Sequence, residues 1–463
     1  MADYDVLVAG GGNAALCAAI AARRAGRRVL VVESAPKFYR GGNTRHTRNM
    51  RCAHDYATDT LTGPYSEDEF FDDLMRVTSG NTDEALSRMM IAKSKPMLDW
   101  IQQQGVRFQP SLGGTISLGR TNSFFLGGGR SMLNALYRTA EDLGVEIRYE
   151  YEVTDLEIVD GRFERATIRH PGGSATISAR SFVAACGGFQ ADLEWLKEGW
   201  GDKADNFLVR GTPYNRGTVT RMLIDNGLQQ IGDASQCHAV AIDARAPKYD
   251  GGIITRLDCV VLGIVVNKNA ERFYDEGEDI WPKRYAIWGR LVANQPDQTA
   301  FIIFDAPNIE RFMPSLYPPI EAATLAELAD KLDLDSSTFE ATVTTFNDAV
   351  VGGRPFDTNE KDGNTTKGLE IEKTNWAQRI DTPPYYAYPV KPGITFTYLG
   401  VKVDAQARIL RDDGNNTPSD NMFAAGEIMA GNVLGQGYAA GIGMTIGAVF
   451  GRIAGEEAAR HAT

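Results

Sequence analysis

The sequence predicts an α/β fold in which a nucleotide-binding domain is interrupted by an inserted α+β domain. The first observation is an apolar strand over residues 5–9, a glycine turn, a helix and a second apolar strand over residues 29–33. This order is typical of one βαβ unit. The second is a change of sequence character near residue 233. The third is the return of strand–glycine junctions near the C-terminus, which predicts that the first domain is completed there.

The glycine turn has the residue types that a dinucleotide needs. Gly10 permits the tight turn, Gly12 leaves room for a pyrophosphate beside the backbone, and Ala15 lets the helix pack close to the strand. The helix N-terminus offers free N–H groups to phosphate. Glu33 follows about twenty residues on and can accept a hydrogen bond from a ribose hydroxyl. The unit therefore predicts nucleotide binding.

A loop rich in glycine and hydrogen-bond donors follows at residues 40–51. Such a loop can place backbone N–H groups against a flat polar ring. Its arginines, Arg45, Arg48 and Arg51, are candidates to line a path for an anion. Farther along, helical spacing and caps predict a helix over residues 82–104.

The rest of the first domain predicts one more helix and several strands. The helix begins at Ser131 and ends at Gly144, and the strands cover residues 145–151, 153–159 and 163–170. A further buried strand over residues 181–188 meets two glycines, as expected where the carboxyl edge of a sheet touches a cofactor.

The insertion carries two helices that begin with capping boxes, Thr324-x-x-Glu327 and Ser337-x-x-Glu340. We expect a capping domain over residues 233–357, and the nucleotide-binding domain in two parts over residues 1–232 and 358–463.

The end of the chain again has strand–glycine junctions like those of the first domain. Residues 401–410 predict a hairpin, residues 422–427 a strand that enters a Gly-Glu turn, and residues 437–455 a glycine-rich helix. The N-terminus of that helix can meet the electron-rich edge of a flavin. A phosphate-binding turn at the start and a Gly-Glu strand near the end fit a long cofactor, which favours FAD over NAD.

Composition argues against several other classes of function. The 463 residues have a formal net charge of −12, which argues against a nucleic-acid partner. The five cysteines lie far apart without a Cys-x-x-Cys pair, so no metal site is expected, and they indicate reduced thiols and a cytoplasmic location. The apolar stretch at residues 422–454 contains Glu427, Arg452 and many glycines, so direct membrane insertion is not expected.

Several motifs, taken in order, resemble the flavoprotein family of fumarate reductase and succinate dehydrogenase over nearly the whole chain. The resemblance implies a Rossmann-like FAD-binding domain of the glutathione-reductase type with an inserted α+β capping domain. Its Gly-Gly-Asn-Thr motif matches the branch with non-covalent FAD, although His46-Thr47 is similar to the motif of the covalent branch. The motifs are Gly10–Ala15 with Glu33, Gly41–Thr44, Val183–Phe189, Val265–Asn267, Arg272–Glu276, Gly400–Asp404 and Ala425–Glu427.

The resemblance assigns FAD binding to residues from both parts of the first domain. They are Gly10, Gly12, Asn13, Ala15, Glu33, Gly42, Asn43, Thr44, Val153, Gly187, Glu427, Gly443 and Met444.

The resemblance also implies a substrate pocket between the FAD domain and the capping domain. His238 matches the first substrate histidine of the family, and Thr255 and Arg256 fall on a Thr-Glu pair. A guanidinium in place of an acid can bind a carboxylate bidentately, so a third substrate carboxylate is expected at Arg256.

Two other substrate residues of the family are replaced. The second histidine aligns with Phe396, and the substrate-clamping arginine aligns with Tyr438. Tyr398 and Tyr438 are the remaining candidates for substrate binding, and a plain fumarate or succinate enzyme is not expected.

The resemblance implies transfer of a hydride to flavin N5 and of a proton to an arginine. Arg284 is the candidate, with Lys283 as the alternative and Glu276 or Asp279 as the acid that relays the proton. Electrons are expected to pass to a separate acceptor protein of the iron–sulfur or membrane type.

Within the family, four segments are similar to tricarballylate dehydrogenases, which oxidise tricarballylate to cis-aconitate. The alternatives are a ketosteroid-type or other α,β-dehydrogenase or reductase, and a flavin oxygenase domain of cobalamin-ring synthesis. The four segments are Gly211–Arg216, Trp281–Tyr285, Ile394–Gly400 and Gly437–Met444.

Overall fold

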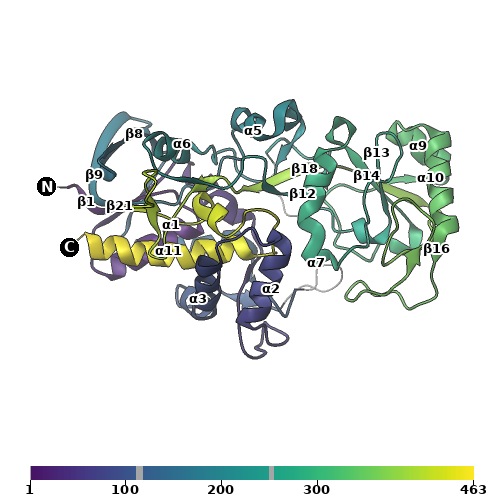
Figure 1. Ribbon diagram of the computed structural model, residues 1–463, viewed down its shortest axis with the longest axis horizontal. Helices are drawn as coiled ribbons and strands as arrows, with labels where there is room; N and C mark the ends of the chain where they lie inside the picture. The colour runs from purple at the N-terminus through teal and green to yellow at the C-terminus, as the bar shows by residue number, and fades with distance from the viewer. Residues whose placement is uncertain (1, 111–117, 250–254, 463) are drawn as a thin grey trace.

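The structure is a computed structural model that describes residues 2–110, 118–249 and 255–462. Figure 1 shows the two ends of the chain together in one part of the molecule, and the middle of the chain in the other part. A mixed sheet lies in each part, which agrees with the predicted α/β fold.

The first sheet contains the predicted βαβ unit. Its main path is β20-β21-β9-β1-β2-β6, and β7 and β8 extend it from β9, which makes eight strands among the described residues. β1 pairs in parallel with both β2 and β9, and all but one of the residues of β1 and β2 are buried. Burial on both faces explains why these strands are continuous apolar runs. The strands are β1 (Tyr4–Ala9), β2 (Val29–Glu33), β6 (Glu146–Tyr149), β7 (Glu152–Val159), β8 (Arg162–His170), β9 (Gly173–Ala184), β20 (Arg408–Leu410) and β21 (Pro418–Ala424).

Helices α1 (Asn13–Arg24) and α11 (Ile442–His461) pack side by side against this sheet, as Figure 1 shows. The glycines of α11 make this contact possible. A Cβ atom at Gly451 would lie 2.5 Å from the Ala14 carbonyl oxygen, and one at Gly455 would lie 2.2 Å from that of Ala18. These two glycines therefore serve the packing of one helix on the other.

The second sheet holds six strands among the described residues, and β18 is its centre. β18 pairs with β10, β12, β14 and β15, and β13 pairs with β14. β10 and β18 come from outside residues 233–357, so this sheet reaches beyond the predicted insertion, whose boundaries stay a prediction. The strands are β10 (Leu208–Val209), β12 (Cys237–Asp243), β13 (Ile264–Asn267), β14 (Ala300–Asp305), β15 (Ile320–Ala322) and β18 (Tyr385–Thr397), with helices α9 (Leu325–Leu332) and α10 (Ser336–Ala349) beside them.

Three predicted helix starts are wrong by a few residues. α4 (Gly128–Asp142) begins before the predicted start at Ser131, after a cap at Gly127 that has positive φ. α10 begins after Asp335, whose carboxylate accepts hydrogen bonds from Thr338 N at 2.8 Å and from Ser337 Oγ at 2.7 Å, so the predicted box at Ser337 is replaced by an Asp cap. α11 begins only after Gly441, because Gly437 and Gly441 both have positive φ and interrupt the helix.

The other elements follow their predictions more closely. α3 (Glu84–Gln102) lies within the helix predicted over residues 82–104, and Leu410 N donates to Lys402 O at 2.9 Å in the predicted hairpin. None of the helices in the described ranges is long and apolar enough to cross a membrane. The remaining helices and strands are α2 (Glu67–Thr78), α3 (Glu84–Gln102), α4 (Gly128–Asp142), α5 (Leu193–Trp200), α6 (Thr218–Asp225), α7 (Trp281–Arg284), α8 (Trp288–Ala293), β3 (Asn49–Arg51), β4 (Phe108–Gln109), β5 (Asn122–Phe125), β11 (Gln230–Ile231), β16 (Val350–Val351), β17 (Thr365–Thr366) and β19 (Gly400–Val401).

Candidate active site

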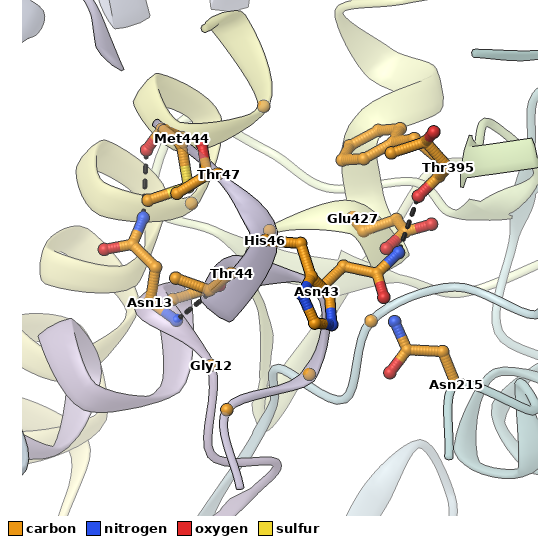
Figure 2. A pocket seen from close by; sticks show the side chains of 18 of the residues that line it. Gly12, Asn13, Asn43, Thr44, His46, Thr47, Asn215, Thr395, Glu427 and Met444 are labelled. Atoms are coloured by element: carbon orange, nitrogen blue, oxygen red, sulfur yellow. Dashed lines mark hydrogen bonds between the residues drawn. The ribbon is translucent and has the colours of Figure 1, made fainter. Parts of the chain in front are cut away.

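A large cavity is lined by residues of both parts of the molecule. It contains about 1780 Å³ of space between atoms, including its opening to solvent. Its lining runs from the glycine turn at Gly10 to Arg256, so one cavity offers room for both a long cofactor and a substrate. Figure 2 shows one region of a pocket where the first helix, the loop after β2 and the C-terminal segment meet.

The glycine turn after β1 forms one end of the cavity. Gly10 has φ +112°, and a Cβ atom there would lie 2.3 Å from the Ala185 carbonyl oxygen. A Cβ atom at Gly11 would lie 2.4 Å from Glu33 Oε2. The turn therefore leaves its backbone bare toward the cavity and cannot accept side chains.

The start of α1 is held in place by two hydrogen bonds, both visible in Figure 2. Asn13 N donates to Thr44 Oγ1 at 3.1 Å, and Asn13 Nδ2 donates to Met444 O at 3.0 Å. Residues far apart in sequence thus meet at the helix N-terminus, where an anion is favoured.

Glu33 lies buried at the end of β2 and lines the cavity. Its carboxylate accepts hydrogen bonds from Ala35 N at 2.9 Å and from Gly41 N at 3.2 Å, and burial raises its pKa above the usual value. Two backbone donors fix the orientation of this acid and leave lone pairs for a ribose hydroxyl.

Glu427 lies in the middle of the cavity wall. Burial raises the pKa of Glu427 to about 7, and its carboxylate accepts a hydrogen bond from Thr397 N at 2.9 Å. Asn43 Nδ2 donates to Thr395 O at 2.7 Å, which ties the loop after β2 to β18 (Figure 2).

The predicted cofactor residues fit FAD. Ala15 does not line the cavity; it is buried inside α1, as close packing of the helix requires. The bare glycine turn, the helix N-terminus and the oriented acid lie in one cavity, as a dinucleotide needs. The predicted residues that line the cavity are Gly10, Gly12, Asn13, Glu33, Gly42, Asn43, Thr44, Val153, Gly187, Glu427, Gly443 and Met444.

Positive side chains gather at another part of the cavity. Arg48, Arg210 and Arg256 all line it. Arg256 Nη2 lies 2.6 Å from Asp258 Oδ1, and Trp281 Nε1 donates to the same oxygen at 2.7 Å. Burial alone would raise the pKa of Asp258, but Arg256 and Arg48 outweigh that effect and hold this pKa below its usual value.

His238 lies between two tyrosines in this region. Its ring stacks on Tyr438, with the centroids 3.9 Å apart, and meets the edge of Tyr285 at 5.7 Å. Burial, followed by the positive charges of Arg210 and Arg256, lowers the pKa of His238 well below its usual value. The imidazole is therefore neutral near pH 7, and its Nδ1 has no hydrogen-bond partner among the described residues.

Of the other predicted substrate residues, only one lines the cavity. Tyr438 lines the cavity, but Thr255 and Tyr398 do not. Both are buried, and the Tyr398 hydroxyl donates to the Gly437 carbonyl oxygen. Tyr398 therefore packs behind the site rather than facing it.

The guanidinium of Arg284 does not line the cavity. Its Nε donates to Glu278 Oε2 at 2.5 Å and its Nη2 donates to Tyr274 Oη at 2.8 Å. Lys283 Nζ lies 3.8 Å from an oxygen of Asp73. The acid beside Arg284 is thus Glu278.

The two acids expected to relay a proton are paired with other residues. Glu276 binds Arg272, with Nη2 and Oε2 2.5 Å apart. Asp279 lies 3.6 Å from Arg76 and 3.5 Å from Lys361.

Sequence reasoning assigned no role to Arg210, Asp258 or Tyr285, and it treated Arg48 only as one of three candidates for an anion path. The structure brings Arg48 to the cavity, whereas Arg51 donates to Ala440 O at 3.1 Å and Arg45 lies outside the cavity lining. The local sequence signal was the density of arginines in one loop.

Comparisons with known proteins agree with this geometry. A family described as FAD binding domain matches residues 5–444. The probable fumarate reductase Ifc3 of Shewanella frigidimarina is 27% identical over 480 residues, covering 99% of this chain and 75% of that protein.

Two solved structures share the fold. The open conformation of a flavocytochrome c3 fumarate reductase has a TM-score of 0.77 at 24% identity and covers 99% of this chain and 78% of its own. The 3-ketosteroid Δ1-dehydrogenase from Sterolibacterium denitrificans has a TM-score of 0.80 at 18% identity and covers 99% of both chains.

Proposed function

This chain belongs to the FAD-binding domain family, as an FAD-dependent oxidoreductase of the fumarate reductase type, and we propose that it oxidises a tricarboxylate. The preferred substrate is tricarballylate, and the product is cis-aconitate. The observation that supports this proposal most is that Arg256 and His238 face the same cavity as the glycine turn that suits FAD. A cationic pocket beside a flavin suits a substrate with several carboxylates.

The residues divide the work between them. FAD, when bound, supplies the two-electron acceptor for the reaction. The turn at Gly10 and the N-terminus of α1 would bind its phosphates. Arg256 and neutral His238 hold substrate carboxylates and so fix the carbon to be oxidised at the flavin, which is where orientation contributes most to the rate.

Arg284 stays our proposal for the proton acceptor, with Glu278 in place of the acids expected from the sequence. Trp281 and Pro282, at the start of the same short helix, line the cavity. Since Arg284 itself faces Glu278, this role requires α7 to move toward the substrate. General acid–base help of this kind contributes about 10²–10⁴-fold to a rate.

Electrons must then leave to a separate acceptor protein. The described residues hold no group of three or more His, Cys, Asp or Glu side chains suited to a metal ion. We propose an acceptor of the iron–sulfur or membrane type, and a cytoplasmic location for this chain.

A ketosteroid-type dehydrogenase is the second candidate function. Phe396, Tyr285 and Tyr438 all line the cavity and present aromatic faces and edges that suit a carbon ring. The hydroxyl of Tyr438, which accepts a hydrogen bond from Gly443 N at 3.2 Å, could then polarise a ketone.

Anaerobic mixing of the FAD-loaded protein with each substrate class separates these candidates. We expect tricarballylate to bleach the yellow flavin absorbance, succinate to do so more slowly, and a 3-ketosteroid to leave it unchanged. Bleaching by the steroid alone would replace the proposal with the second candidate. Rapid reoxidation by O₂ without turnover of any acid would favour the oxygenase alternative instead.

A further inference from the structure

We propose that Arg48 is a second anchor for a substrate carboxylate and forms, with Arg256, a pair of guanidiniums that close on one carboxylate from opposite parts of the molecule. Asp258 positions both. This inference rests on the proposed function, because it requires a polyanionic substrate, and it assigns a role to a residue from the FAD-binding part of the chain.

The two arginines come from distant segments. Arg48 follows the short 3-10 helix η2 (Gly42–His46), which lines the cofactor end of the cavity. Arg256 follows β12, in the part of the chain that covers the cavity, and forms an isolated bridge with Ile242. Asp258 lies within reach of both, so the carboxylate marks the point where the two parts meet.

Asp258 serves the two arginines unequally. Its Oδ1 is occupied by Arg256 and by Trp281, whereas its Oδ2 lies 3.8 Å from Arg48 Nη2, beyond hydrogen-bond distance. The side chain of Arg48 is 15% exposed and that of Asp258 is 1% exposed. Arg48 is thus held near the acid by charge but keeps its donors for another group.

Two donors of this pair lack partners. Arg48 Nη1 and Arg256 Nε are buried and have no hydrogen-bond partner among the described residues. A buried donor on a charged group is costly to leave unsatisfied. Both residues line the cavity, so a carboxylate that enters it can accept a hydrogen bond from each.

Arg48 and Arg256 share one acid among the residues that the structure describes. In the described part, Asp258 is the one carboxylate within 4.0 Å of the side-chain nitrogens of Arg48 and Arg256. Burial, and next the charge of Arg256, lower the pKa of Arg48 to about 9, while Arg210 adds to this effect. Two largely buried guanidiniums that share one acid are completed by an anionic ligand.

The test uses the FAD-loaded protein and cis-aconitate, which binds the oxidised enzyme without reducing it. We would measure binding by calorimetry for the wild type, Arg48→Gln, Arg48→Lys and a control, Arg165→Gln. Arg165 pairs with Glu157 on the exposed face of β7 and β8 and does not line the cavity. Its replacement by Gln removes the same charge as Arg48→Gln.

We expect Arg48→Gln to bind cis-aconitate about 10- to 100-fold more weakly, as for loss of a charge-assisted hydrogen bond. Arg48→Lys keeps the charge but not the planar fork, so we expect a smaller loss of about 3- to 10-fold. The control should bind like the wild type. In turnover, the loss should appear mainly in KM.

Two results would overturn the inference. One is wild-type affinity in both Arg48 variants, and the other is a variant that loses FAD, or loses kcat with unchanged KM, since either assigns Arg48 to the cofactor or to proton transfer. If Arg48→Gln does not fold, the affinity of Arg48→Lys for cis-aconitate alone tests the inference. A wild-type protein that binds no polycarboxylate would instead refute the proposed function itself.

Discussion

Replacement of Asp258 by Asn tests how the charges of the cavity are balanced. The substitution keeps the shape of the side chain but removes the one carboxylate that the described residues place within 4.0 Å of Arg48 and Arg256. Trp281 Nε1 can still donate to the amide oxygen at the same place. The effect is therefore electrostatic rather than steric.

The expected loss is large because Asp258 is fully buried and both arginines are largely buried. Removing one partner of a buried ion pair typically destabilises a protein by about 3–5 kcal/mol, since the other charge is left uncompensated. Without ligand, we expect Asp258→Asn to lower the free energy of unfolding by that amount. A bound polycarboxylate replaces the missing charge and no longer meets the repulsion of Asp258. Two like charges about 6 Å apart at an effective dielectric constant of about 20 repel by roughly 3 kcal/mol.

Urea unfolding with saturating FAD, with and without cis-aconitate, measures both effects. The deficit of the variant should shrink by about 1–3 kcal/mol when the ligand is present. Asp243→Asn is the matched control: Asp243 is also fully buried and accepts from Arg245 Nη2 at 2.6 Å, but neither residue lines the cavity. Its deficit should not respond to the ligand.

An Asp258→Asn variant as stable as the wild type would show that the acid does not balance the arginines. A deficit that is the same with and without cis-aconitate would show that the ligand does not bind beside them. Either result would refute the electrostatic account of the cavity.

Four further predictions concern single residues. Gly10→Ala should lose FAD, because a Cβ atom would lie 2.3 Å from a backbone oxygen, and the flavin-to-protein ratio of the purified protein measures this. Arg256→Ala should weaken tricarballylate by about 1.5–3 kcal/mol more than succinate in binding assays, and equal weakening would remove the third-carboxylate contact. Arg284→Lys should reduce turnover by orders of magnitude while FAD stays bound; near-normal turnover would end its proposed role. For Glu427, burial raises the pKa to about 7, so its contribution to stability is present below pH 4.5 and is lost as the pH rises through 7. Glu427→Gln should therefore gain about 3 kcal/mol over the wild type between pH 4.5 and 8 in urea unfolding of flavin-free protein, and parallel pH profiles would contradict this.

The cofactor end could be predicted because its signals are local. The turn at Gly10, the helix after it and the acid at Glu33 lie within about thirty residues, and each residue type has a direct steric or hydrogen-bonding reason. The contacts of such a short segment form within the segment itself, so they can be predicted without knowledge of the rest of the fold.

The cationic end could be predicted only in part. Arg48 and Asp258 come from distant segments that meet only in the folded chain, and nothing in either segment indicates the other. The direction of the Arg284 side chain depends on the single turn of helix α7. The sequence did not indicate that Glu278, rather than Glu276 or Asp279, binds its guanidinium. Pairing across distant segments and the choice between neighbouring acids need the folded chain.

Strand β18 has a consequence for how substrate enters. Its thirteen residues run from Tyr385, beside β15, to Thr397, whose N–H donates to Glu427. One continuous strand thus joins the capping part of the molecule to the wall of the cavity at Glu427. A hinge motion of the whole capping part about flexible connections is incompatible with a continuous strand of this kind. We expect the substrate to enter the cavity through local motion of peripheral turns, such as α7. Strand β18 then keeps the distance between the capping part and the cofactor end constant.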